Sequence, residues 1–171
     1  MGFDKKYYKE EFENLLKEKN KRKFYIKESN SLFKINRYIK KGTESLELAG
    51  YIKNSDKDAK SYWVIIVCYY SMLYMAKAAI LTKGYETDDH YATQIALGHL
   101  MVPGEIEKED LELLEQSYKI FEEDYIDYFD DARKESSVSR YSATKVYNER
   151  RVKEIFENAR KFISKLRIIL K

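Results

Sequence analysis

The chain has 171 residues, of which 44% are hydrophobic and 36% are charged, and its formal net charge is +3 at pH 7. This composition predicts one soluble globular domain with a substantial core and excludes an intrinsically disordered chain. The single cysteine, Cys68, excludes an internal disulfide. Because the first thirty residues are charged and contain no signal-type apolar run, we expect a cytoplasmic protein.

The N-terminal residues 1–30 are predicted to form a helical extension, with a helix over about residues 4–19 followed by a basic patch. Residues 31–171 are predicted to form the main helical domain, since the chain has one proline, six glycines and almost no alternation with period two. The first helix of this domain carries one apolar stripe, which implies packing on one side. The stripe consists of Leu32, Ile35, Ile39, Leu46 and Ala49, with Gly42 filling one step.

The segment from Tyr62 to Leu81 is apolar on every side and ends at Gly84, a helix-stop residue. Such a helix either crosses a membrane or lies at the centre of a helical bundle. Its tyrosines are spread along the segment, and Lys77 lies well inside it. Because these polar groups need partners that lipid does not provide, we expect a bundle centre and no membrane.

Three further helices complete the predicted fold. Thr87, Asp88 or Asp89 can cap a short helix that runs to about Leu100. Two long helices follow, each with one buried seam in a 3,4 rhythm. The seams are Leu111, Leu114, Tyr118, Phe121, Tyr125, Tyr128 and Ala132, and then Val152, Ile155, Ala159, Phe162, Leu166 and Ile169. The fold class is therefore all-α: an up-and-down bundle of four long helices plus a short helix, with an extra N-terminal helix.

Charge is distributed unevenly along the chain. Residues 86–131 carry fifteen acids and two bases, whereas residues 133–171 carry twelve bases and four acids. Two explanations stay open: neighbouring antiparallel helices neutralise each other, or the basic C-terminal part forms a surface that attracts phosphate.

Motifs for common catalytic sites are absent from the sequence: it has no Gly-rich phosphate loop, no GxSxG and no Cys/His metal spacing. Asp124, Asp127 and Asp131 share one helical face, but no histidine lies at a spacing that would complete a metal site. The sequence therefore predicts neither a metal nor a cofactor.

Two places in the sequence contain side chains that could bind a ligand or take part in catalysis. His90 follows two aspartates in a loop, where we expect it to be exposed and able to titrate, whereas His99 is expected to pack. The segment from Arg133 to Tyr141, which includes Ser136 and Arg140, interrupts the bundle between its last two long helices. Its arginines can hold a phosphate and Tyr141 can stack on a base, or the arginines can pair with the acidic residues before them.

Several of these residues, taken in order, resemble the HEPN family (higher eukaryotes and prokaryotes nucleotide-binding), in its archaeal and bacterial small-protein branch. The matching features extend over about residues 31–171 and exclude the first thirty. They are Tyr69-Tyr70-Ser71-Met72, Lys83-Gly84-Tyr85, the loop histidine His90, Ala132-Arg133, Tyr141, and Ala159 with Phe162.

The resemblance implies a helical bundle that commonly dimerises and is often encoded with a nucleotidyltransferase partner. Many members are metal-independent ribonucleases of toxin–antitoxin, defence or RNA-processing systems, with an Arg followed four to six residues later by a His. In this chain Tyr141 takes the place of that histidine, and the place of the arginine falls near Ser136. The chain therefore departs from the catalytic pattern.

Three hypotheses follow from the resemblance. The first is a binding module for a nucleotide, RNA or a partner protein, with Arg133, Ser136, Arg140 and Tyr141 as ligand-binding residues. The second is a metal-independent endoribonuclease with a divergent site that uses Arg133, Arg140, Tyr141 and His90. The third is a structural partner of a nucleotidyltransferase.

Overall fold

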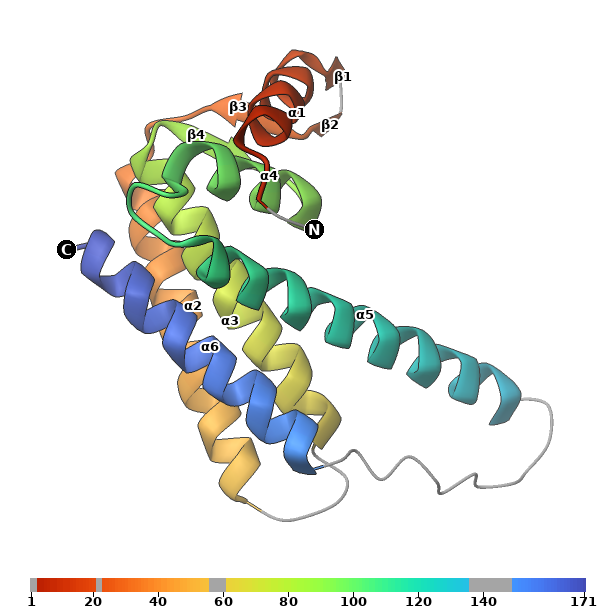
Figure 1. The fold of residues 1–171 in the computed structure, drawn as a ribbon. Coiled ribbons are helices and arrows are strands. Elements are labelled where there is room, and N and C mark those ends of the chain that lie inside the picture. The colour runs from red at the N-terminus through yellow and green to blue at the C-terminus, as the bar shows by residue number, and fades with distance from the viewer. Residues whose placement is uncertain (1–2, 21–22, 56–60, 136–148) are drawn as a thin grey trace.

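The computed structural model describes residues 3–20, 23–55, 61–135 and 149–171, and for residues 19–20, 23–24, 61–62, 123–135, 149 and 151 it describes the backbone alone. The helices are α1 (Lys5–Lys17), α2 (Leu32–Asn54), α3 (Ser61–Thr82), α4 (His90–Met101), α5 (Lys108–Glu135) and α6 (Glu149–Ile169). The strands are β1 (Lys19–Asn20), β2 (Lys23–Phe24), β3 (Ile26–Glu28) and β4 (Tyr85–Thr87). Figure 1 shows the bundle of α2, α3, α5 and α6, with α1 and α4 at one end. The predicted all-α fold is confirmed.

Helix α3 is the centre of the bundle, because it packs against α2, α4, α5 and α6 (Figure 1). The stretch Trp63–Thr82 is long and apolar enough to cross a membrane, but most of it is buried inside the protein. Its one lysine, Lys77, donates a hydrogen bond to the Asp88 carbonyl oxygen at 2.6 Å. Burial and an internal partner for this charge favour the predicted bundle centre.

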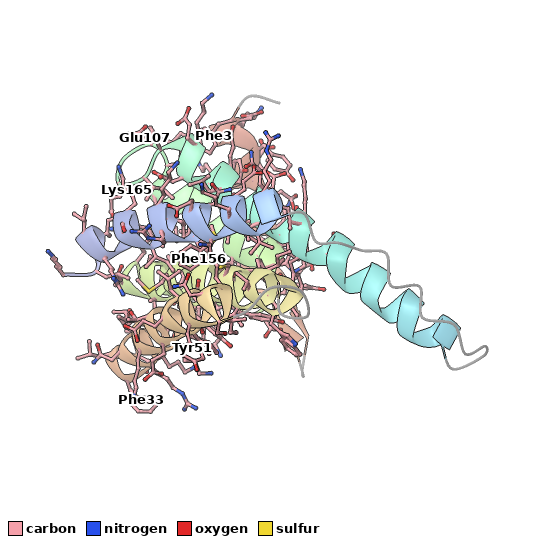
Figure 2. All side chains as sticks on the ribbon, turned by 90° about the horizontal axis from the view of Figure 1, so that it is seen from below. Phe3, Phe33, Tyr51, Glu107, Phe156 and Lys165 are labelled. Atoms are coloured by element: carbon pink, nitrogen blue, oxygen red, sulfur yellow. The ribbon has the colours of Figure 1, made fainter. Side chains whose placement is uncertain are left out.

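Helices α2 and α3 pack closely because α2 carries glycine at the contact. A Cβ on Gly42 would lie 2.6 Å from Met75 Cγ and 3.1 Å from the Ser71 carbonyl oxygen. The predicted stripe is confirmed at Gly42 and Ala49, which are buried. It is wrong at Leu32, which is 69% exposed. The first turn of α2 lies at the edge of the bundle, where Figure 2 shows the neighbouring Phe33 pointing away from the other helices.

The N-terminal residues contain more than the predicted helix. β3 pairs antiparallel with β4, with Ile26 opposite Thr87, and so ties the N-terminal segment to the chain that follows α3. Helix α1 packs on α4 and buries Phe12 and Leu15. The rings of Phe12 and Tyr85 form a T-shaped pair, with centroids 5.0 Å apart and an interplanar angle of 84°. Strand residues in this segment are too few to show a period of two, so the sequence did not indicate them.

The predicted helix stop after α3 and the predicted N-cap of α4 are both confirmed. Gly84 has φ +86°, a left-handed conformation that glycine adopts without strain. Asp89 is the N-cap of α4, and its side chain accepts a hydrogen bond from the Ala92 backbone nitrogen at 2.8 Å.

The last two long helices bury their predicted seams where side chains are described. Leu111 and Leu114 of α5 are buried, as are Ile155, Phe162 and Leu166 of α6. The C-terminal half of α5 projects away from the bundle and from α6 in both views (Figures 1 and 2). This arrangement therefore does not favour the explanation that α6 of the same chain neutralises the acidic part of α5.

Candidate functional site

His90 is held in place by the N-terminus of α4. Asp89 caps the helix, so His90 is its first residue and its ring is directed toward α5. There the imidazole stacks on Tyr118, with ring centroids 3.7 Å apart and an interplanar angle of 18°. The expectation of an exposed loop histidine is wrong, because the chain between α3 and α4 is short and the cap places His90 against α5.

Aromatic rings surround this pair. Tyr69 of α3 stacks on Phe121 of α5, with centroids 4.7 Å apart, and its ring lies 5.5 Å from that of Tyr118. The cavity between these rings and the neighbouring side chains has a volume of about 10 Å³. A space of this size holds one water molecule at most. The half-buried rings of His90 and Tyr118 thus pack at the edge of the core, and the space enclosed between them and α3 is too small for a nucleotide.

Burial sets the protonation of the cluster. It lowers the pKa of His90, and the charges of Asp89 and Glu122 offset only part of this effect. Burial also raises the pKa of Tyr118 to about 12, and the hydrogen bond to Glu122 adds to the shift. His90 is consequently neutral near pH 7, and Tyr118 is a weaker acid than an ordinary tyrosine.

The structure does not bring His90 and Arg133 together within one chain. Both Tyr118, which contacts His90, and Arg133 belong to the continuous helix α5. Arg133 follows Tyr118 by fifteen residues, which corresponds to about 22 Å along the helix axis. His90 therefore cannot act on the same phosphate as Arg133 of its own chain.

The remaining predicted site residues cannot be placed. Ser136, Arg140 and Tyr141 lie outside the described residues, and for Arg133 only the backbone near the end of α5 is described. The same holds for the side chains of Asp124, Asp127 and Asp131. Among the side chains that are described, no group of His, Cys, Asp and Glu is arranged to hold a metal ion.

The two other groups discussed from the sequence are structural. His99 packs beside Phe12, with ring centroids 4.6 Å apart, as predicted. Burial raises the pKa of Cys68 to about 12, so its thiol is protonated and behaves as a small hydrophobic side chain. Sequence reasoning missed the role of Tyr118, because a seam position in a helix does not reveal which residue of another helix it meets.

Comparison with known proteins identifies the family. The model of the HEPN domain matches residues 35–169. The chain belongs to the HEPN family. A search of the curated proteins found no match. Membership implies a nucleotide- or RNA-related role, and HEPN domains commonly dimerise. The match begins within α2, so α1 and the strands β1, β2 and β3 precede it.

Proposed function

We propose that this HEPN protein is a cytoplasmic module that binds RNA or a nucleotide through the junction from Arg133 to Tyr141, and that it does not cleave RNA by the usual HEPN route. The observation that carries this proposal is that Arg133 lies about 22 Å along α5 from Tyr118, the residue on which His90 of the same chain stacks. A role in a toxin–antitoxin or defence system is part of the same proposal.

The sequence supports the loss of the nuclease motif. The chain has two histidines, His90 and His99, and both precede Arg133. No histidine therefore follows an arginine of the junction. Of the two, His90 is stacked on Tyr118 and His99 is packed against Phe12.

The chemistry of RNA cleavage explains why this loss matters. Cleavage without a metal needs a base with a pKa near neutral for the 2′-hydroxyl proton and an acid for the leaving oxygen. Tyr141 takes the place of the motif histidine, and an ordinary tyrosine has a pKa of about 10. It is a poor base at neutral pH, although its ring can stack on a nucleobase and its hydroxyl can bond phosphate.

Charge supports binding. Residues 133–171 carry twelve bases and four acids, and the exposed side chains of α6 include Arg160 and Lys161. Arginines that contact a phosphodiester backbone increase affinity by releasing counterions from the RNA. This contribution falls as the salt concentration rises. Because the acidic half of α5 projects away from α6, this basic surface is not neutralised by that segment (Figures 1 and 2).

The experiment that tests the proposal is fluorescence anisotropy with labelled tRNA and a mixed single-stranded RNA, in EDTA. Arg133→Ala and Arg140→Ala are each expected to weaken binding about threefold to tenfold, as loss of one phosphate contact does. Arg37→Ala is the matched control: it removes the same charge from an exposed position on α2. Binding that is equal in all three variants, or no binding by the wild type at low salt, contradicts the proposal.

A homodimer is the second element of the proposal. Leu48 and Tyr51 lie on one face of α2 and are 49% and 73% exposed, and Figure 2 shows Tyr51 at the outer side of that helix. We infer that these two exposed apolar side chains form part of the dimer interface. Light scattering coupled to gel filtration is expected to give twice the monomer mass of 20.5 kDa and a lower mass for Tyr51→Ser. A monomeric wild type at micromolar concentration contradicts the dimer.

A further inference from the structure

A cavity of about 670 Å³ lies between α1, α4 and the beginning of α5. Its volume falls within the range of small-ligand sites. Figure 2 shows Phe3 and Glu107 at this end of the molecule, far from the projecting end of α5. From Leu111 in its wall to Arg133 the distance is about 33 Å along the helix axis. The cavity is therefore separate from the proposed RNA site.

The wall of the cavity combines aromatic rings with carboxylates. It is lined by Phe3, Tyr7, Tyr8, Tyr91, Leu111 and Gln94 and by the charged residues Asp4, Lys108, Glu112 and Glu115. Three carboxylates thus face one ammonium group. Lys108 is drawn toward Glu109, with its Nζ 3.7 Å from Oε1. The net charge of the wall is negative, which disfavours a phosphate or carboxylate ligand and favours a cation.

The carboxylates differ in their partners. Asp4 caps α1, and its Oδ1 accepts hydrogen bonds from the backbone nitrogens of Lys6 and Tyr7. Glu115 pairs with the exposed Lys119, at 2.9 Å. Glu112 is exposed and has no hydrogen-bond or salt-bridge partner among the side chains that the structure describes. Glu112 is consequently the carboxylate best able to bind an added cation.

The aromatic rings are held in fixed positions. Tyr8 stacks on Phe3 and lies against Gly98, where a Cβ would approach its ring to 2.3 Å. Tyr91 donates a hydrogen bond to Glu11 at 2.9 Å, so in the 3.2 Å contact between Tyr7 and Tyr91 the Tyr7 hydroxyl is the donor. Tyr7 and Tyr91 remain 47% and 39% exposed. Accessible tyrosine rings attract organic cations through their electron-rich faces.

The negative charges act inside the cavity. Burial raises the pKa of Tyr8, the hydrogen bond with Gln94 opposes this, and the charges of Glu115 and Glu112 raise it further. Both carboxylates therefore act electrostatically on a hydroxyl in the cavity wall. The same negative charges of Glu112 and Glu115 that disfavour ionisation of Tyr8 would stabilise a cation bound in the cavity.

We propose that this cavity binds a small organic cation of the diamine or polyamine class. One ammonium group lies against the rings of Tyr7 and Tyr91 and near Glu112, and the alkyl chain packs on Leu111 and Phe3. Three of the four aromatic side chains come from the N-terminal segment: Tyr7 and Tyr8 from α1, and Phe3 from just before it. The segment that precedes the HEPN match therefore completes the site.

Isothermal titration calorimetry with spermidine and with putrescine, in 150 mM salt, tests the site. The wild type is expected to bind both, and the uncharged butane-1,4-diol is expected not to bind. Glu112→Gln and Tyr7→Leu each are expected to weaken binding about tenfold, as loss of one ionic or cation–π contact does. Both positions are exposed, so the fold is retained, which thermal unfolding checks.

The control is Glu107→Gln, which removes the same charge from the exposed residue just before α5, outside the cavity wall, and leaves the Lys108–Glu109 pair intact. Its affinity for spermidine is expected to equal that of the wild type. Equal weakening by Glu107→Gln and Glu112→Gln would show general attraction to the acidic residues of this region and overturn the site. Binding of the diol, or no binding at millimolar spermidine, would overturn it too. Arg133→Ala is expected to leave spermidine binding unchanged, so this result is independent of the RNA proposal.

Discussion

The imidazole of His90 and the ring of Tyr118 form a stacked pair, with centroids 3.7 Å apart, that joins the start of α4 to the middle of α5. This contact fixes His90 in a packed aromatic cluster. It also fixes the position of His90 relative to Arg133, which lies near the C-terminal end of α5. The contact therefore bears on both the stability and the function of the protein.

Replacing Tyr118 with leucine is expected to raise the pKa of His90 toward its ordinary value. Burial lowers this pKa in the folded protein, and leucine leaves one face of the imidazole open to water. Titration of the histidine Cε1 proton by NMR measures the change. His99, which packs against Phe12 instead, is the internal control and is expected to keep its pKa. An unchanged His90 pKa would show that the stack does not cause the shift.

The lowered pKa values of His90 and His99 give stability a defined dependence on pH. The unfolded chain takes up these protons at about pH 6.5, before the folded protein does. Their stabilising contribution is therefore complete above that pH and is lost as the pH falls toward the folded-state values. Thermal unfolding at pH 7.5 and pH 5.5 is expected to show a smaller loss of Tm for His90→Gln than for the wild type. A loss of equal size contradicts the role of His90.

The pKa of Glu86 is also lowered, but by ion pairing and hydrogen bonding instead of burial. Burial raises the pKa of Glu86, yet the hydrogen bonds from Lys34 at 2.8 Å and the charge of Lys27 lower it more. Its contribution to stability is therefore present above the unfolded-state pKa and is lost as pH falls through the folded-state value. Glu86→Gln is expected to cost about 1–2 kcal/mol at pH 7 in urea unfolding. The cost should shrink below pH 4; a constant cost contradicts the assignment.

Gly42→Ala is expected to destabilise the fold by about 1–3 kcal/mol, because the new methyl group meets Met75 and the backbone of Ser71. Gly50→Ala, in the same helix, is the control. There the nearest atom is Phe156 Cζ at 3.5 Å, an ordinary contact, so alanine is expected to stabilise by about 0.5–1 kcal/mol. Urea unfolding measures both. Equal effects at the two positions would contradict close packing of α2 on α3.

Much of the fold could be predicted from the sequence because helical periodicity is a local signal. The seams of α5 and α6, the buried α3, the helix stop at Gly84 and the N-cap at Asp89 all depend on residues a few positions apart. The pairing of β3 with β4 joins residues about sixty positions apart. The strands are also three residues long, so nothing in either segment indicates the partner.

The candidate site was less accessible to prediction. Exposure of His90 was inferred from its polar neighbours, but its environment is set by Tyr118, which is contributed by a different helix. Likewise, the rings around the 670 Å³ cavity come from α1 and α4, and their approach depends on Gly98. A single glycine in a helix does not reveal which side chain will lie against it.

Gly98→Ala is expected to displace Tyr8 and loosen α1 from α4, since the added Cβ would lie 2.3 Å from the Tyr8 ring. Limited proteolysis is expected to cut the first thirty residues faster than in the wild type. The double variant Gly98→Ala with Tyr8→Leu removes the rigid ring and is expected to restore part of the protection. No change in the rate of cleavage by Gly98→Ala would contradict docking of α1 on α4.

The central claim concerns catalysis, and the most direct measurement is a cleavage assay with end-labelled tRNA and mixed RNA in EDTA. Our account predicts that purified protein shifts the RNA in a salt-sensitive complex and leaves it intact. It also predicts that Arg133→Ala reduces the shift and that His90→Ala leaves the RNA intact, as the wild type does. Cleavage by the wild type that is abolished by Arg133→Ala would contradict the account.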